Sequence, residues 1–377
     1  MRRQRTRHQL PQQSSMNVAI VHDFLLKLGG AERVVKALMD MFPKAVLHAL
    51  LYDEEKVGEV FPKERVKTSF LQSYPKFLRN RYRFLTHKMP RAIEEMDLSS
   101  YDLVISSSTA FAHGAMTTTD TKHLCYCHSP MRYAWDWSNE YRKENQLKGF
   151  KGLLYAKLIK NLREWDKVAA DRPDLYVANS QNVHNRLRKY YGVDSDIIYP
   201  PVDTERFRAK GEHENYFLIV STLTPYKRVD LAVQLFNKIN RKLVIIGDGP
   251  QRNYLESIAG DNIDFLGFKD DKTVKEYMEN CRALIFPGEE DFGITPIEAM
   301  ACGKPVLAFG KGGAVESILS GKTGEFFFEP NVEAMEDGLA RLMYNEKFYK
   351  PHTIRKHAGN FGREIFEKKI RSRIKNI

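Results

Sequence analysis

Two glutamates eight residues apart, Glu290 and Glu298, flank a glycine, Gly293, in the second half of the chain. Pro296 suits the first position of a helix and Thr295 suits its cap, so we predict a helix start between the two acids. A helix N-terminus at the carboxyl edge of a parallel sheet favours anions. The spacing therefore predicts a crevice for a phosphorylated ligand. Glu298 would either face that crevice or close a capping box with Thr295.

Two adjacent cations, Lys227 and Arg228, follow another run of strand-forming residues. Thr224 and Pro225 predict a second helix start, which puts both cations in its first turn. A cation in that turn opposes the helix dipole unless an anion offsets it, so the pair favours a bound diphosphate. Solvent exposure is an adequate alternative explanation for Arg228 and a weaker one for Lys227.

A Cys-x-Cys-His pattern, formed by Cys125, Cys127 and His128, is compatible with a metal site. Successive residues of a strand point to opposite faces, so the two cysteines would lie on one face and His128 on the other. We therefore predict no metal there. Asp194 and Asp196 form an Asp-x-Asp pattern, which we interpret as a surface turn because it stands just before an expected interdomain strand, Ile197-Ile198-Tyr199.

Two glycine-containing turns add to the candidate site. Gly29-Gly30 and Gly247 each follow a run of strand-forming residues, where glycine lets the backbone approach a ligand closely. Each is a weak signal by itself, because glycine is also common in ordinary turns.

Short β-branched and apolar runs alternate with amphipathic helical patterns along the whole chain. The runs are 17–24, 45–52, 103–108, 123–128, 175–180, 216–222, 242–247, 263–268, 283–287 and 305–309. Most are apolar at successive positions, as expected of strands buried on both faces of a parallel sheet. This strand–helix alternation predicts an α/β fold with two doubly wound domains.

The domain boundary is predicted at Pro200-Pro201, because two prolines cannot continue a central strand. The domains would then span 16–200 and 201–354. The basic helical pattern at about 355–377 would form a terminal helix that packs back on the first domain. Residues 1–15 are basic and lack an apolar run, so we predict no secretory signal and expect either a disordered tail or an upstream-start extension before Met16.

The composition excludes two classes of protein. The 377 residues are 42% hydrophobic and 28% charged, which is too apolar for disorder and too charged for a membrane bundle. No stretch approaches the roughly 20 apolar residues of a spanning helix. The four cysteines show no disulfide spacing, which favours a reducing compartment, and we expect a cytoplasmic protein.

The net charge of +11 is clustered. Residues 76–91 contain six Lys or Arg and no acid, and residues 350–377 contain nine against two acids. Aromatic and cationic residues mix in 74–89 and 152–167, which suits either an anionic membrane surface or core packing with a solvated face. No zinc-finger spacing or RNP-like motif is present, so we predict no nucleic-acid binding.

The pattern Glu-x-Phe-Gly-x-x-x-x-Glu that begins at Glu290, followed by Ala-Met-Ala-Cys-Gly-Lys-Pro-Val, resembles the signature of retaining glycosyltransferases of family 4. The resemblance extends over nearly the whole chain from Met16. It implies the GT-B fold, in which two Rossmann-like domains face a central cleft. It also implies a nucleotide-sugar co-substrate without a metal or any other cofactor.

The resemblance further implies roles for the candidate residues. Glu290 would contact the donor sugar and Glu298 the nucleotide ribose, while the adjoining turn lies near the sugar and the diphosphate. That turn comprises Phe292, Gly293, Ile294 and Thr295.

Lys227, Glu290 and His128 would be the catalytic residues. Lys227, with the substrate-binding Arg228 beside it, would hold the leaving diphosphate, and His128 would lie against the donor sugar. The backbone at Gly29-Gly30 would face the donor phosphates and the acceptor, and Gly247 would lie on the nucleotide side.

The stretch that begins at His128 resembles the version found in bacterial mannosyltransferases of O-antigen and exopolysaccharide assembly. This resemblance favours GDP-mannose as donor and a saccharide or polyprenyl-diphosphate-linked saccharide as acceptor, in surface polysaccharide or lipopolysaccharide biosynthesis. Thr222 stands where the family usually has arginine. Three alternatives therefore remain: a nucleotide-sugar-binding protein with weak or no transfer, a UDP-sugar-dependent transferase, and another GT-B chemistry such as epimerisation or phosphorolysis.

Overall fold

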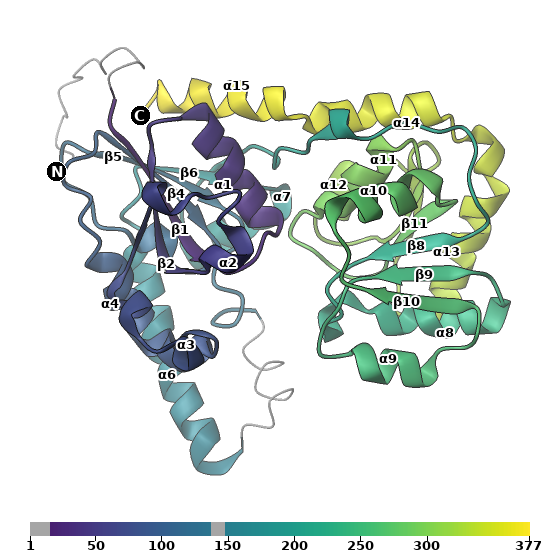
Figure 1. Ribbon diagram of the computed structural model, residues 1–377, viewed down its shortest axis with the longest axis horizontal. Helices are drawn as coiled ribbons and strands as arrows, with labels where there is room; N and C mark the ends of the chain where they lie inside the picture. Colours follow the sequence, from purple (N-terminus) through teal and green to yellow (C-terminus); the bar gives the residue numbers. More distant parts are fainter. Residues whose placement is uncertain (1–15, 137–147) are drawn as a thin grey trace. The chain divides into compact units, whose positions relative to one another are not determined.

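The computed structural model describes residues 16–136 and 148–377, which form two compact units (Figure 1). Unit 1 comprises Met1–Asn179, Val183–Ile198 and Glu367–Ile377, and unit 2 comprises Ser180–Asn182 and Tyr199–Phe366. The predicted tail at residues 1–15 lies outside the described residues.

Unit 1 contains a seven-stranded parallel sheet in the order β3-β2-β1-β4-β5-β6-β7. Its strands are β1 (Val18–Leu25), β2 (Val46–Tyr52), β3 (Val66–Thr68), β4 (Leu103–Ser108), β5 (Lys122–Cys127), β6 (Leu175–Ala178) and β7 (Asp196–Ile197). The helices are α1 (Gly30–Met41), α2 (Glu54–Val57), η1 (Lys63–Arg65), η2 (Phe70–Ser73), α3 (Lys76–Arg79), η3 (Tyr82–Lys88), α4 (Met89–Glu94), η4 (Ala112–Gly114), α6 (Gly149–Ala169) and α7 (Gln181–Tyr190). The strand order reverses between β1 and β4, and open α/β sheets bind ligands at such a point.

Unit 2 contains a six-stranded parallel sheet in the order β10-β9-β8-β11-β12-β13, of which Figure 1 shows β10, β9, β8 and β11 side by side. Its strands are β8 (Phe217–Val220), β9 (Leu243–Ile246), β10 (Ile263–Gly267), β11 (Ala283–Phe286), β12 (Val306–Phe309) and β13 (Gly324–Phe327). The helices are η5 (Thr204–Arg206), η6 (Pro225–Lys227), α8 (Val229–Ile239), α9 (Arg252–Ile258), α10 (Asp271–Asn280), α11 (Ile294–Ala301), α12 (Ala314–Ser317), α13 (Val332–Tyr344), η7 (Glu346–Phe348), α14 (Pro351–Ala358) and η8 (Gly359–Phe361). Here the order reverses between β8 and β11, which brings the loops after these two strands together.

These two sheets confirm the predicted fold class, and all ten predicted strands are present. The strand expected at 197–199 is present as β7, and the structure adds β3 and β13 at edges of the two sheets. Neither shows a continuous apolar run, because β3 has only three residues and β13 begins with Gly324 and Glu325. The central strands form the core because they are buried along their whole length, as in β4, β9, β11 and β12.

The predicted terminal helical segment is interrupted in the structure. The segment forms α14, the short turn η8 and α15 (Arg363–Ile374), because Gly359 and Gly362 interrupt the helical pattern. The end of the chain belongs to unit 1, where Arg371 donates to the Met41 carbonyl at 3.3 Å and Arg373 pairs with Asp196 at 2.7 Å. The terminal helix therefore packs on the first domain, as predicted.

In the described part of the chain, every helix is too short or too polar to cross a bilayer.

Candidate functional site

The ammonium of Lys227 and the carboxylate of Glu290 form an ion pair at the carboxyl edge of the unit 2 sheet. Lys227 ends η6, just after β8, and Glu290 lies in the loop after the neighbouring strand β11. Gly288 permits the close approach of the two loops, because a Cβ atom there would lie 2.7 Å from the Lys227 Cα atom. Both charged side chains are largely buried, with 17% and 18% of their surface exposed.

The predicted helix start at Pro225 is wrong in part. Thr224 and Pro225 begin only the 3₁₀ turn η6, and the α-helix begins at Val229. Arg228 interrupts the two because its φ is +51°, in the left-handed region that non-glycine residues rarely adopt. The cations therefore stand before the helix and not in its first turn. The Arg228 guanidinium lies 3.3 Å from Asp230, which leaves Lys227 as the cation that faces Glu290.

The helix between the two glutamates begins earlier than predicted. Helix α11 starts at Ile294, and its cap residue is Gly293 with φ +86°, so the predicted Thr295 cap and capping box are wrong. Pro296 occupies the third helical position. An N–H group there would have no acceptor within the helix, so the N–H that proline lacks is not needed. The N-terminus of α11 nevertheless follows Glu290 directly, at the carboxyl edge of the sheet, as the anion-binding prediction requires.

Glu298 is buried and paired with a residue that the sequence did not single out. Arg206 donates to a Glu298 oxygen at 2.6 Å and to Asp271 at 2.9 Å. In the sequence, Arg206 lies in a polar stretch that reads as a linker. A buried carboxylate needs a cation to compensate its charge, and the Arg206 guanidinium supplies one and holds the Glu298 side chain in place.

Glycines let four loops crowd together at this edge. A Cβ atom on Gly247 would lie 1.8 Å from the Ser221 carbonyl oxygen, and one on Gly312 would lie 2.2 Å from the Glu290 carbonyl oxygen. The Gly313 N–H donates to that same Glu290 carbonyl at 2.9 Å. Gly312 and Gly313 were missed, although a glycine-rich run straight after a predicted strand is the signal that marks Gly247.

The ring of Phe292 does not face the crevice. It is 3% exposed and stacks on Tyr199, with ring centroids 5.2 Å apart, and it also contacts Phe361. Only its backbone is thus available to a ligand. Ile294 and Thr295 are half-buried in the first turn of α11, and Thr222 is exposed just after β8.

The remaining predicted residues belong to unit 1. Gly29 caps α1 and Gly30 is its first residue. His128 follows β5, and its Nε2 atom lies 2.8 Å from the Ser107 hydroxyl. Cys125 and Cys127 are buried against α7, where burial raises the pKa of the Cys125 thiol to about 12. Within residues 16–136 and 148–377, no three candidate metal ligands come together.

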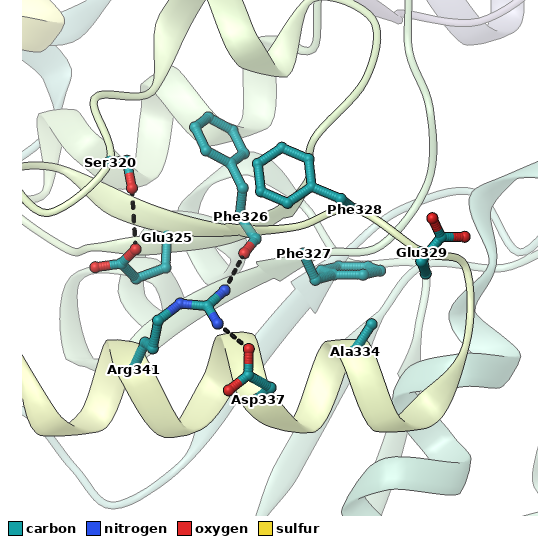
Figure 2. Close-up of a pocket in the computed structure, with 9 residues that line it drawn as sticks. All are labelled: Ser320, Glu325, Phe326, Phe327, Phe328, Glu329, Ala334, Asp337 and Arg341. Carbon is teal, nitrogen blue, oxygen red and sulfur yellow. Dashed lines mark hydrogen bonds and ion pairs between the residues drawn. The ribbon is translucent and has the colours of Figure 1, made fainter.

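A separate cavity of about 330 Å³ lies beside β13 and α13 (Figure 2). It contains none of the predicted site residues. Figure 2 shows Arg341 donating to the Phe326 carbonyl, at 2.7 Å, so this guanidinium covers the free edge of β13. The cavity is therefore a feature of the sheet edge and not of the candidate site.

Two family models match the chain in succession. Glycosyltransferase Family 4 matches residues 28–206, and glycosyl transferases group 1 matches residues 203–361. An uncharacterised glycosyltransferase of Methanocaldococcus jannaschii is 29% identical over 59% of this chain and 62% of its own length, which is less than two thirds. An alpha-1,3/1,6-mannosyltransferase of Dictyostelium discoideum is 22% identical over 88% of this chain and 90% of its own.

Among solved structures, HepE of Anabaena in complex with UDP superposes with a TM-score of 0.70 at 17% identity. The superposition covers 96% of this chain and 100% of HepE, and it shows a shared fold. Together, the two family models and the two parallel sheets establish that the chain belongs to family 4 of the glycosyltransferases, with the GT-B fold.

Proposed function

We propose that the chain transfers a hexose from a nucleoside diphosphate sugar to an acceptor hydroxyl, with retention of the anomeric configuration. The observation that carries the proposal is the Lys227–Glu290 pair at the point where the strand order of unit 2 reverses. An ammonium and a carboxylate held side by side offer partners for the two ends of such a donor. The ammonium suits the diphosphate, and the carboxylate suits the sugar hydroxyls.

Charge develops on the diphosphate as the bond to the sugar breaks. Lys227 and the N-terminus of α11 would stabilise that charge, and removing one such donor typically costs about 3 kcal/mol, or ~10²-fold in rate. Glu290 and the backbone of Gly293 to Thr295 would hold the sugar. The family resemblance assigns His128 to the donor sugar as well. The departing phosphate oxygen would take the acceptor proton on the same face, without a covalent glycosyl-enzyme.

GDP-mannose is the donor that we propose. The motif that begins at His128 and the similarity to an alpha-1,3/1,6-mannosyltransferase support mannose. The fold shared with HepE, whose structure contains UDP, keeps a UDP-sugar as the alternative. A donor panel decides between them, because a bound ligand raises the melting temperature. GDP-mannose should stabilise the protein more than UDP-glucose or UDP-N-acetylglucosamine does, and the reverse order would assign the UDP-sugar.

A nucleotide-sugar-binding protein without turnover is the second candidate, and Thr222 favours it. Thr222 is exposed just after β8 and supplies no charge where the family usually has arginine. Release of nucleoside diphosphate from any donor of the panel excludes this candidate. Binding without any product would establish it.

We further propose a saccharide or polyprenyl-diphosphate-linked acceptor, reached at the cytoplasmic face of an anionic membrane. Five large apolar side chains in α3, η3 and the first turns of α6 are strongly exposed. They are Phe77 (64%), Phe84 (70%), Phe150 (73%), Leu153 (67%) and Leu154 (52%). In Figure 1 those first turns of α6 extend beyond α3 and α4. η3 and α6 both contribute buried side chains, Leu85 and Ile159 among them, to one hydrophobic cluster.

Cations surround these apolar side chains. Arg81 and Arg83 are exposed in and beside η3, and Lys151 and Lys157 are exposed on α6. Exposed aromatic and aliphatic groups with interspersed cations match the chemistry of anionic lipid headgroups over acyl chains. This match supports a bilayer as the partner of the surface formed by α3, η3 and the first turns of α6.

Vesicle flotation tests the membrane proposal. Phe84→Ser and Phe150→Ser should each weaken binding to phosphatidylglycerol vesicles about tenfold, since a buried Phe side chain is worth roughly 1.5–3 kcal/mol. Tyr344→Ser with Phe348→Ser is the matched control, because these side chains of unit 2 are also exposed, at 78% and 58%. Equal binding to phosphatidylcholine vesicles, or an equal loss in the control, would contradict the proposal.

A further inference from the structure

A buried acid–base pair links the glycine turn of unit 1 to His128. His22 lies on β1, and its Nε2 atom is 3.6 Å from a Glu32 oxygen on α1. His22 is 1% exposed and Glu32 is 9% exposed. Neither residue was singled out in the sequence, because one lies inside an apolar strand and the other on the buried face of a helix.

Three adjacent strands bring the polar groups together. His22 on β1 stands opposite Ser107 on β4, and His128 follows β5, which pairs with β4. The His22 Nδ1–H donates to the Ser107 carbonyl at 2.8 Å, while the Ser107 hydroxyl lies 2.8 Å from His128 Nε2. Ser107 thus connects the two imidazoles through its carbonyl and its hydroxyl.

On the other side, Glu32 holds the glycine turn. The Gly29 N–H donates to a Glu32 oxygen at 2.8 Å. A Cβ atom on Gly29 would lie 2.9 Å from that oxygen. A larger residue at position 29 would therefore displace this Glu32 oxygen, although the φ of −118° is open to any residue.

The geometry indicates a charged pair. A neutral imidazole that donates through Nδ1 has a lone pair on Nε2, which would face the Glu32 carboxylate unfavourably. Burial by itself lowers the pKa of His22, but the hydrogen bond and charge of Glu32, with the charge of Asp23 and the hydrogen bond to Ser107, raise this pKa above its usual value. Burial likewise raises the pKa of Glu32, but His22 and the backbone N–H groups of Gly29 and Glu32 lower it below its usual value.

A second carboxylate close to His22, that of Asp23, is hydrogen-bonded to backbone N–H groups. Asp23, the neighbour of His22 on β1, accepts the backbone N–H groups of Thr109, Ala110, Phe111 and Ala112. Among the elements packed around His22, β2 places the uncharged Ala49 opposite it, α1 contributes Glu32 and β4 contributes the Ser107 groups. The ring of His128, after β5, lies 6.5 Å from the His22 ring between centroids. Glu32 is thus the carboxylate that faces the His22 ring.

We propose that His22 and Glu32 act as a positioning pair for glycosyl transfer, which fixes the Gly29-Gly30 turn and the Ser107–His128 contact in one arrangement. The inference rests on the proposed function, because it assigns a task to His128 and to the glycine turn in that reaction. Both side chains are buried, so the pair acts through the groups that it holds. It is intact at pH values between the lowered pKa of Glu32 and the raised pKa of His22. Transfer should therefore decline as the pH rises through the pKa of His22.

Two variants of nearly unchanged size test the pair. His22→Gln and Glu32→Gln should each lower kcat about tenfold or more, because a misplaced group far from the reacting bond has effects of up to ~10²-fold. The alkaline decline in kcat should disappear in His22→Gln. The double variant should lose no more than either single one, since both remove the same unit. Ser107→Ala, which keeps the carbonyl and removes the hydroxyl, should lower kcat and retain the alkaline decline.

A merely structural role would predict a different pattern. It would lower the melting temperature and the amount of active protein while the shape of the pH profile stayed the same. That pattern, or an unchanged kcat in His22→Gln, would overturn the inference.

The titration of the His22 imidazole, followed by NMR and assigned with His22→Gln, is independent of turnover. It should show a pKa above 6.5 in the wild type, and this pKa should fall in Glu32→Gln. A wild-type pKa below 6.5 would contradict the charged pair. If the wild type transfers no sugar from any donor, the proposed function fails, whereas this titration still decides whether the pair exists.

Discussion

The ammonium of Lys227 contacts the carboxylate of Glu290, although 63 residues separate them in the chain. The contact exists because β8 and β11 are neighbours in the unit 2 sheet and both end at the same edge. β11 lies on the side of β8 opposite to β9 and β10, and this strand order brings Lys227 and Glu290 together. A donor that binds there must insert between the two charges or share them.

Replacing Glu290 with glutamine should lower the rate of sugar transfer about 10²-fold and leave the fold intact. Glutamine keeps the size of the side chain but loses the charge that accepts strongly from sugar hydroxyls and from Lys227. Initial rates of nucleoside diphosphate release measure the effect. Glu289→Gln, at the exposed neighbouring position, is the control and should retain normal rates. Equal rates in both variants would remove Glu290 from the site.

Introducing arginine at the exposed position 222 should leave donor binding equal or strengthen it up to about tenfold. A hydrogen bond to a charged group is worth roughly 1.5–3 kcal/mol, and the diphosphate would gain one. Isothermal titration calorimetry with the donor measures Kd in Thr222→Arg and the wild type. A Kd that rises more than tenfold would mean that the crevice is arranged differently.

Gly288→Ala should displace the Lys227 backbone, because the added methyl group would lie 2.7 Å from the Lys227 Cα atom. Such overpacking typically destabilises by about 1–3 kcal/mol, and the displaced ammonium should also weaken donor binding. Denaturant unfolding and donor titration measure the two effects. Gly211→Ala serves as the control, since a Cβ atom at Gly211 has nothing within 4 Å. Similar donor affinity in both variants would argue against the role of Lys227.

The free energy of unfolding should fall as the pH drops below 6.5, in part because of His123. Burial lowers the pKa of His123 to about 3, with smaller contributions from His113 and Arg172. The unfolded chain binds this proton near pH 6.5 and the folded chain does not, so stability declines between these values by up to about 1.4 kcal/mol per pH unit. Unfolding by urea at pH 6.5 and at pH 5 should show a smaller decline in His123→Gln than in the wild type. Identical declines would contradict the assignment.

The central strands were predictable because strands buried on both faces are continuously apolar. The edge strands β3 and β13 were not, since β3 has only three residues and β13 begins with Gly324 and Glu325. The helix starts were misplaced by a few residues at Thr295 and Pro225. In each case one residue with positive φ, Gly293 or Arg228, sets the true boundary of the helix. The residue types near these positions do not predict which residue adopts the left-handed conformation.

The candidate site was predictable only where chemistry and position coincide in one short segment, as at Glu290 and Lys227. Arg206, His22 and Glu32 were missed because each owes its place to a partner far along the chain or to burial. Arg206 lies in a polar stretch, and its contact with Glu298 spans 92 residues. The order of the strands and the packing of the helices determine these contacts, and neither can be predicted from a short stretch of sequence.

The most direct test of the account compares sugar transfer from GDP-mannose by the wild type, Lys227→Ala and Lys322→Ala. Lys322 is an exposed lysine of the same unit, outside the loops that form the site. Lys227→Ala should transfer about 10²-fold more slowly, at an unchanged melting temperature, because the leaving diphosphate loses its cation. Lys322→Ala should match the wild type. If Lys227→Ala transfers sugar as fast as Lys322→Ala does, the charge at this sheet edge does not carry the reaction.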